Sequence, residues 1–358
     1  MNENFLGRNG FTWFNGVVED RNDPLKTGRV KVRVVGVHTA DKTVLPTTDL
    51  PWALCVLPIT ASGISGIGQS STGLVEGSWV FGFFRDGESM QEPVVMGSLP
   101  GYAIEVANRS KGFFDPNGIY PKYINEPDVN RLAVNSEEAP SLPLLLRQAT
   151  RITGVPTADT NAFTSADGTT TTASDGTLWN QPEIPYAAVY PYNHVYESES
   201  GHLREFDDTL GHERIYEAHR TGTSYEIGPD GTKTEIIKGG HYTLTSGTTG
   251  HYIQGDSDVT ISGHSKVFIN KNGEANNHYD IQIGPNANVN IQVDNGDINL
   301  NTVTGKINMN AGGDYNLKVG GNYTVAVAGN IIENVEGAKT SNTTGAVIHR
   351  GSTIDLNP

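Results

Sequence analysis

Three histidines and two aspartates in one short stretch are the side chains in this sequence best suited to bind a metal ion. They are His202, Asp207, Asp208, His212 and His219. A zinc or iron site needs three or four such groups converging on one point, with a second shell that orients them. On an extended strand His202 and Asp208 share a face, but a turn predicted at Thr209–Gly211 leaves the convergence of the set open. We therefore expect hydrogen bonds within a β layer rather than a metal.

A second set of carboxylates has the composition of a glycosidase acid/base pair. Glu137 and Glu138 are adjacent, and further acids lie around Asp115. Sugar hydrolysis requires two carboxylates held at a defined separation by a rigid scaffold. These acids lie in a proline-rich connector, which offers nothing to fix or desolvate them. We expect them to be solvated acids without a catalytic role.

No other motif in the sequence predicts catalysis or a cofactor. The glycine-rich stretch Ser62–Gly73 has the spacing G-x-x-G-x-G and no following lysine, so it matches neither a dinucleotide fingerprint nor a P-loop. There is no Gly-x-Ser-x-Gly elbow. The single cysteine, Cys55, lies in the apolar run PWALCVLPI and is predicted to be a small buried hydrophobe. We expect no enzyme activity, no cofactor and no metal.

The composition favours a thin all-β protein. Of 358 residues, 36% are hydrophobic and 18% charged, both low for a globular enzyme, while 42 are glycine. The net charge of −15 without a basic stretch argues against binding to a phosphate backbone. The polar start MNENFLGRNG predicts no signal peptide, and no apolar run is long enough to span a bilayer. We expect synthesis in a cytoplasm.

Five short apolar runs, each flanked by glycine or proline, predict a barrel in residues 1–110. In Gly28–Gly36 (GRVKVRVVG) valines alternate with Arg29, Lys31 and Arg33, which predicts a half-buried strand. A short strand and an Asp-Pro turn precede it. Further strands are expected at Ala53–Ile59, Trp79–Phe84 and Pro93–Leu99. Five strands in about a hundred residues are typical of a small barrel of the OB type.

Residues 111–185 have a different character. Prolines recur through them beside the polar tract TSADGTTTTASDGT, which predicts an extended linker with at most one helical turn near Leu144–Arg147. The β pattern resumes at Tyr186, so residues 186–230 are expected to form a β junction. Residues 231–358 then form the last domain, interrupted at 264–304.

Glycine recurs every eight residues along most of this last domain, in two blocks that each keep phase. A fixed period of this kind indicates one small unit stacked repeatedly. Glycine lacks a Cβ, so it also allows the backbone to kink at each octad boundary. The interval between the blocks is 42 residues and is predicted to hold a bulge or a small hairpin. The repeat glycines are Gly231, Gly239, Gly247, Gly255, Gly263, Gly305, Gly313, Gly321, Gly329, Gly337 and Gly345.

Within the octads, apolar side chains collect on one parity. Residues two before and two after each glycine of the second block are mostly valine, isoleucine or tyrosine, while Asn308, Asn316 and Thr324 fall on the other parity. Side chains alternate between the two faces of an extended chain. The pattern therefore predicts β structure, with six residues of strand per octad that cannot bury themselves.

Several segments, in the expected order, resemble one family. Trp13–His38 (WFNGVVEDRNDPLKTGRVKVRVVGVH), Leu50–Phe84 and Asn108–Tyr123 resemble the central spike, or baseplate hub, proteins of T-even-type contractile-tailed phages. Tyr190–Thr232 resembles the segment before the shaft in these spikes and in the valine-glycine-repeat spikes of type VI secretion. The octads are similar to their shaft repeat. Together these segments cover about two thirds of the chain.

The resemblance implies a homotrimer whose three chains wind into a three-stranded β-helix with an apolar interior, behind an OB-type head. It also implies hub proteins docked at the OB end. Some phage spike tips hold iron with a His-x-His pair, whereas His349 stands alone near this C-terminus, so the resemblance implies that a small separate protein caps the tip. The location would be the tail baseplate of a virion, and the task would be to puncture an outer membrane. The residues that would face the common axis are Val303, Ile307, Tyr315, Val319, Tyr323, Val327, Ile331 and Val335.

The sequence departs from the family between the head and the shaft. Well-known members carry a lysozyme domain there, which needs well over a hundred residues, whereas the interval from about Tyr123 to Pro185 holds some sixty residues of linker composition. We expect a spike without muramidase activity.

Three alternatives remain. A secretion or extracellular-injection spike shares the architecture, but such spikes usually carry hub domains ahead of the OB domain, for which the barrel-like start at Trp13 leaves no room. A β-helical tailspike that binds or cleaves polysaccharide would need paired carboxylates and exposed aromatics, whereas the octads show Asn, Thr and Gly. An OB-type nucleic-acid binder would need a basic face.

Overall fold

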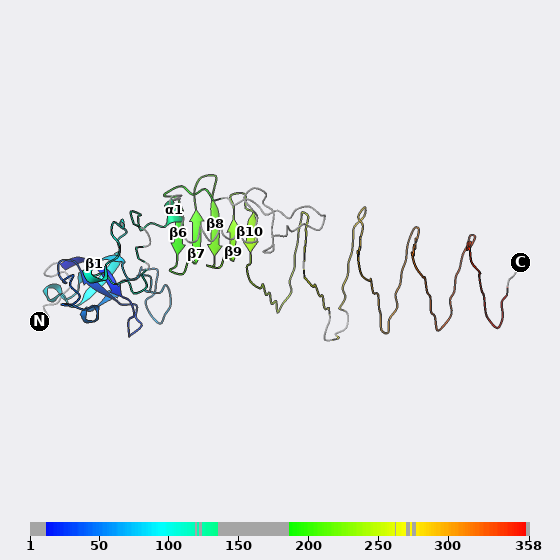
Figure 1. Ribbon diagram of the computed structural model, residues 1–358, viewed down its shortest axis with the longest axis horizontal. Coiled ribbons are helices and arrows are strands. Elements are labelled where there is room, and N and C mark those ends of the chain that lie inside the picture. The colour runs from blue at the N-terminus through cyan, green and yellow to red at the C-terminus, as the bar shows by residue number, and fades with distance from the viewer. Residues whose placement is uncertain are drawn as a thin grey trace. The chain divides into compact units, whose positions relative to one another are not determined.

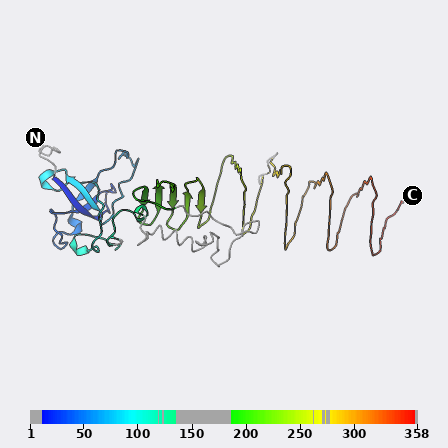
Figure 2. The ribbon, with the colours of Figure 1, turned by 90° about the horizontal axis from the view of Figure 1, so that it is seen from above.

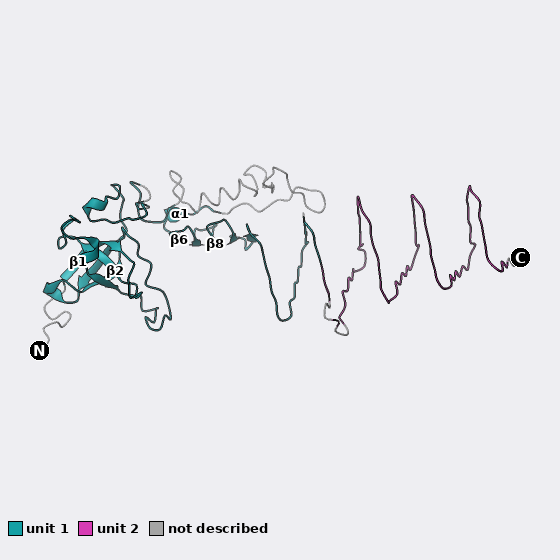
Figure 3. Cartoon of the chain, turned by 60° about the horizontal axis from the view of Figure 1, so that its bottom comes forward, with its two compact units in different colours: residues 1–266 teal, residues 267–358 magenta. Residues whose placement is uncertain are grey.

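The computed structural model describes residues 12–118, 120–121, 124–134, 186–261, 263–269, 273 and 277–355. The chain divides into two compact units, residues 1–266 and residues 267–358 (Figure 3). The first unit holds every strand that the described residues form, and it is considered first.

A closed five-stranded barrel lies at the beginning of the chain (Figure 1). Its strands are β1 (Thr12–Asp20), β2 (Val30–Val34), β3 (Trp52–Cys55), β4 (Trp79–Phe84) and β5 (Pro93–Ser98), with short 3₁₀ turns at Thr47–Asp49, Gly87–Ser89 and Arg109–Lys111. The order around the barrel is β1-β2-β3-β5-β4, with β3 and β5 parallel and β1 closing on β4. The predicted barrel of five strands is therefore confirmed.

Alternate residues of these strands fill the barrel. Along β1 and β4, Phe14, Val18, Val80 and Phe84 are buried while Trp13 and Trp79 are half exposed on the outside. This is the inside–outside alternation that a small barrel requires. The full core consists of Phe14, Val18, Val30, Val32, Val34, Ala53, Val80, Phe84 and Val95.

Strand β2 departs from the predicted half-buried pattern, because all five of its residues are buried. Arg33 forks onto Glu19, with Nε 2.7 Å from Oε1 and Nη2 3.0 Å from Oε2, and donates to the carbonyl oxygens of Thr39 and Leu45. Lys31 donates to the Thr48 carbonyl. The loop of residues 39–48 therefore covers the outer face of β2, and a buried charge is tolerated there because it is fully paired.

Gly82 in β4 is a point where a side chain has no room. A Cβ on Gly82 would lie 2.1 Å from the Val94 carbonyl oxygen and 2.7 Å from Cζ of Phe14. We expect Gly82→Ala to destabilise the barrel by about 2 kcal/mol or more, since overpacking costs roughly 1–3 kcal/mol. Guanidinium unfolding followed by tryptophan fluorescence measures this, because Trp13, Trp52 and Trp79 lie in the barrel.

Gly97→Ala in β5 is the matched control, since a Cβ there meets nothing within 4 Å. Equal midpoints for the two variants would contradict the steric argument.

The described residues between 99 and 134 make specific contacts with one another, in a part of the chain where an extended linker is expected from residue 111 onward. Asp128 and Gly101 exchange hydrogen bonds, and Tyr102 bridges to Pro127. The short helix α1 (Arg131–Val134) buries Leu132 almost completely. The rest of the expected linker, with the helical turn predicted near residues 144–147, lies outside the described residues.

A second sheet follows, with five antiparallel strands in chain order (Figures 1 and 2). The strands are β6 (Asn193–Glu197), β7 (Leu203–Asp207), β8 (Arg214–Ala218), β9 (Ser224–Ile227) and β10 (Lys233–Ile236). Leu203 and Tyr216 form a small core with Leu132 of α1, so the helix covers one face of the sheet. Arg21 of the loop after β1 donates both Nη atoms to Glu199 at 2.7 Å, which ties the β6–β7 turn to the barrel.

After β10 the described chain contains no strand and runs as extended segments joined by bends. In the second unit these segments follow one another as a zigzag (Figure 3). Between residues 303 and 345 the bends lie at 303–305, 312–313, 320–321, 328–329, 336–337 and 344–345. The backbone therefore changes direction about every eight residues.

Candidate functional site

The apolar stripe of the second unit is uncovered in the single chain. The eight residues predicted to face a common axis are 44% to 92% exposed, from Val319 at the low end to Val303 at the high end. Exposed apolar surface of this extent normally marks an interaction site. The stripe made by Val303, Ile307, Tyr315, Val319, Tyr323, Val327, Ile331 and Val335 is called the axial stripe below.

Three further residues belong to this surface and are not among the predicted axial positions. Met309, Leu317 and Val325 stand four residues after Gly305, Gly313 and Gly321, and each is more than half exposed. They share the odd parity of the axial stripe. Their apolar side chains at odd-numbered positions would have identified them in the sequence, whereas the prediction rests only on positions two before and two after each glycine.

The repeat glycines coincide with the bends, with one exception. All ten from Gly239 to Gly345 lie at a bend. A Cβ would meet nothing within 4 Å at eight of them, the exceptions being Gly305 and Gly345, each next to a threonine hydroxyl. Gly231 instead lies in the β9–β10 turn with φ of +81°, the left-handed region that glycine favours. The first octad glycine therefore belongs to the sheet.

The interval 264–304 continues the alternation of segment and bend in its described part. A turn lies at 285–286 and a bend at 294–296, and Asn286 and Gly296 both have positive φ. The spacing lengthens to about nine residues here and is marked by Pro285-Asn286 and Asp294–Gly296 rather than by octad glycines. The predicted bulge or hairpin would include residues 270–272 and 274–276, which lie outside the described residues.

The covered face of the second sheet holds a buried cluster of charges around Arg214. The Arg214 side chain is fully buried, and it pairs with Glu205, with Asp207 at 3.5 Å and with Glu226 at 3.1 Å. Its guanidinium carbon lies 4.7 Å from the ring centroid of Tyr186, a cation–π contact. One arginine thus holds three carboxylates, so this part of the sheet depends on a single cation.

The opposite face of the same sheet is solvent-exposed and carries apolar side chains beside charged ones such as Arg204 and Glu217. Tyr196, Phe206 and Ile215 are 70%, 41% and 37% exposed, and they belong to three adjacent strands. The guanidinium carbon of Arg204 lies 5.0 Å from the ring centroid of Phe206. Exposed apolar side chains are therefore present in the sheet as well as in the octads.

The residues considered for a metal site do not converge. The rings of His202 and His219 lie 4.5 Å apart, while His194, not His202, approaches Asp208 at 3.5 Å. Asp207 lies on the covered face with Arg214. Among the described residues no group of three or more His, Cys, Asp or Glu side chains is placed to hold a metal ion. Asp207 thus pairs with Arg214 and not with these histidines.

The other candidate groups have structural partners or lie outside the described residues. Asp115 is buried and accepts hydrogen bonds from the backbone N–H groups of Gly118 and Tyr120 at 2.7 and 2.8 Å, which stabilises a turn. Burial raises the pKa of the Cys55 thiol to about 11, which disfavours the reactive thiolate. Glu137 and Glu138 are outside the described residues. Ser62–Gly73 is an irregular loop without regular strand or helix.

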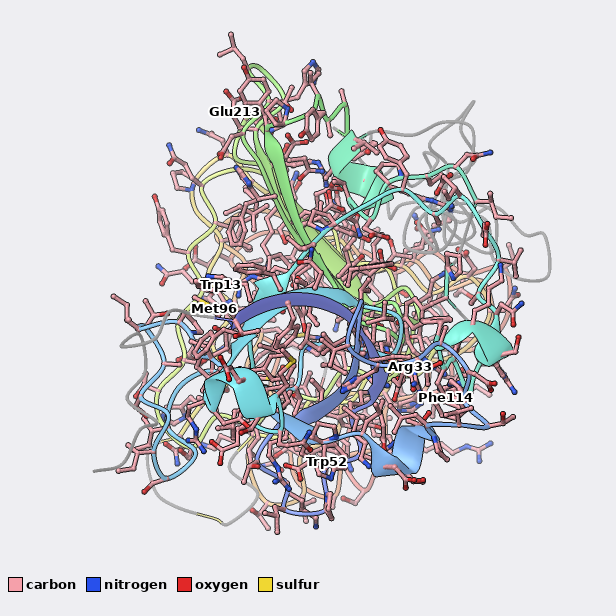
Figure 4. All side chains as sticks on the ribbon, turned by 90° about the vertical axis from the view of Figure 1, so that its left-hand side faces the viewer. Trp13, Arg33, Trp52, Met96, Phe114 and Glu213 are labelled. Atoms are coloured by element: carbon pink, nitrogen blue, oxygen red, sulfur yellow. The ribbon has the colours of Figure 1, made fainter. Side chains whose placement is uncertain are left out.

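Two apolar surfaces of the barrel are available to a partner. Trp13 stacks on Phe81 with centroids 5.1 Å apart and meets the edge of Phe83. In Figure 4, Trp13 and Met96 lie on one side of the barrel and Arg33 and Phe114 on the other. A groove of about 1080 Å³ lies between the barrel and the segment after β5, lined by residues that include Val35, Trp79, Leu99, Ile104 and Val106.

Among the described residues, no helix is long and apolar enough to cross a bilayer.

The chain is similar in sequence to a known protein family and to two phage proteins. The Gp5 N-terminal OB domain family matches residues 36–173. Protein Gp5 of Vibrio phage KVP40 is 40% identical over 296 residues, which cover 75% of this chain and 67% of that protein. The pre-baseplate central spike protein Gp5 of Enterobacteria phage T4 is 46% identical over 134 residues, which cover 36% of this chain and 23% of that protein.

Proposed function

Since the chain belongs to the Gp5 family of phage baseplate central spike proteins, we propose that it forms a homotrimeric spike that punctures the outer membrane of the host cell. The observation that carries the proposal is the axial stripe, whose eight apolar side chains are 44% to 92% exposed in the single chain. Burying one such side chain contributes about 1.5–3 kcal/mol. Three chains that share one axis would bury all of them, as a three-stranded β-helix.

The repeat glycines support close contact between chains. Within one chain a Cβ at Gly313, Gly321, Gly329 or Gly337 would meet nothing within 4 Å, and none of these glycines has a positive φ. Neither intrachain crowding nor backbone strain accounts for glycine there. The close approach of another chain's backbone at each bend does account for it.

The spike acts mechanically in this proposal. Closed stacking of three chains leaves few free strand edges and makes a stiff shaft. Contraction of the tail sheath would drive this shaft through the membrane before the genome is ejected. The apolar surfaces of the barrel, at Trp13 and in the groove beside Trp79, would dock the hub proteins of the baseplate. A small separate protein would cap the C-terminal tip.

Light scattering of the purified full chain tests the assembly. We expect a particle mass of three chains, stable to dilution, because none of the described residues covers the axial stripe in the single chain. A stable monomer would refute the shaft.

We further propose that this spike has no muramidase activity of its own. The support is the length of the interval from about residue 123 to 185, which is too short for a phage-type lysozyme domain. The purified trimer is expected to leave the turbidity of a peptidoglycan suspension at the level of buffer, with hen lysozyme as the positive control. Clearing above the buffer rate would overturn this proposal and leave the structural one standing.

A further inference from the structure

Two charged residues interrupt the apolar parity near the end of the octads. From Val303 to Val347 the odd-numbered positions carry only two charges, Glu333 and Lys339. The even-numbered positions of the same range carry Lys306, Asp314, Lys318 and Glu336. Charged residues are thus common at the even-numbered, polar positions and rare at the odd-numbered positions of the axial stripe.

Glu333 and Lys339 contact each other. Their side chains form an ion pair between the Lys339 ammonium and the Glu333 carboxylate, on either side of the bend at 336–337. Both are exposed in the single chain, at 56% and 63% of their side-chain surface. An exposed ion pair contributes little to stability in water. The contribution of this pair therefore depends on whether assembly leaves it exposed or buries it.

The apolar octads do not define how three chains align along an axis. Tyr315, Leu317 and Val319 recur eight residues later as Tyr323, Val325 and Val327. A shift of one chain by eight residues therefore superposes tyrosine on tyrosine and valine on valine. Register is weakly specified wherever such a shift preserves the packing.

We propose that Glu333 and Lys339 set the register of the three chains, by forming a ring of three glutamates and three lysines around the axis. This inference rests on the proposed trimer and goes beyond it by naming the residues that align the copies. In the aligned trimer every charge meets opposite charges on its own chain and on its neighbours. A chain shifted by eight residues keeps its own pair but surrounds it with apolar groups such as Ile331 and Val347 of the other chains.

The physical reason is the cost of desolvation. Charges buried among apolar side chains lose their hydration, and one intrachain partner repays this only in part. A single polar position fixes register and oligomer state in coiled coils by the same mechanism.

Pulsed EPR distances between spin labels test the register directly. Thr340→Cys on the polar parity carries the label, in a chain with Cys55→Ser. Three aligned chains place the labels on an equilateral triangle, so the parent and the reversed pair Glu333→Lys/Lys339→Glu are expected to give one distance. Glu333→Val/Lys339→Val is expected to keep the trimer but to add a longer distance from shifted chains. A single unchanged distance in this apolar variant would overturn the proposal.

Single substitutions supply the second measurement. Glu333→Gln and Lys339→Gln each leave three unpaired charges at the axis, and each is expected to lower the melting temperature of the trimer by about 5 °C or more. Lys318→Gln and Glu336→Gln, on the polar parity, are the controls and should leave it unchanged. Unchanged melting of all four variants would place Glu333 and Lys339 away from the axis. A monomeric parent would instead refute the trimer itself.

Discussion

Replacing both Val319 and Val327 with aspartate is expected to abolish the trimer. Both valines belong to the axial stripe and stand two residues before a repeat glycine. The variant would bring two carboxylates from each of three chains to one apolar axis without a partnering cation. At roughly 3 kcal/mol or more for each buried unpaired charge, the total exceeds the stability of ordinary domains, which is about 5–15 kcal/mol. Light scattering should return single chains, and heat- and detergent-resistant particles should be absent from gels.

The matched control changes the other parity of the same octads. Asn316→Asp with Thr324→Asp adds the same number of charges per chain, on positions predicted to face solvent. This variant is expected to remain a trimer, with a small loss of stability at low salt from mutual repulsion. If the valine variant still forms a heat-resistant trimer, or if both variants dissociate equally, the assignment of the inward parity is wrong.

Arg214→Met is expected to unfold the second sheet. The substitution preserves much of the side chain's length but removes the cation that Glu205, Asp207 and Glu226 share. Breaking a buried ion pair on one side costs about 3–5 kcal/mol, and here Glu205 and Asp207 are both buried. Limited proteolysis should show cleavage between residues 193 and 236 under conditions in which the parent chain is protected.

Two further variants separate electrostatics from packing. Arg204→Met changes the same residue type on the neighbouring strand β7, where the side chain is exposed, and should leave protection intact. Arg214→Met combined with Glu205→Gln removes one of the stranded buried charges and should recover part of the protection. If the single Arg214→Met variant is as protected as the parent, the cluster does not stabilise the sheet.

Local patterns were sufficient for the barrel strands. Trp79–Phe84 was predicted with the bounds that the structure shows, and the other four strands lie within a few residues of their predicted runs. The alternation of apolar residues and the glycine or proline that flanks each strand are properties of neighbouring residues, so they can be recognised in the sequence. The burial of Lys31 and Arg33 could not be, because it depends on a loop more distant in the chain and on Glu19 as a partner.

The exposed apolar stripe could be predicted from the sequence, but not all of its members were. The period of eight and the parity of the axial stripe follow from the sequence alone, yet Met309, Leu317 and Val325 were overlooked. Gly231 has the spacing of an octad glycine, but its position in a hairpin turn depends on the pairing of β9 with β10. Spacing alone does not distinguish a turn from a bend.

The period of the octads, their apolar parity and the strands of the barrel could be predicted from the amino-acid order alone, because each is a repeating relation between residues close in the chain. The tertiary structure was needed to show that Arg214 gathers three carboxylates, that His202 and His219 meet without Asp207, and that Leu132 packs on Leu203 and Tyr216. These contacts join residues on different strands, and which strands pair and which faces are covered follow from the packing of the whole unit.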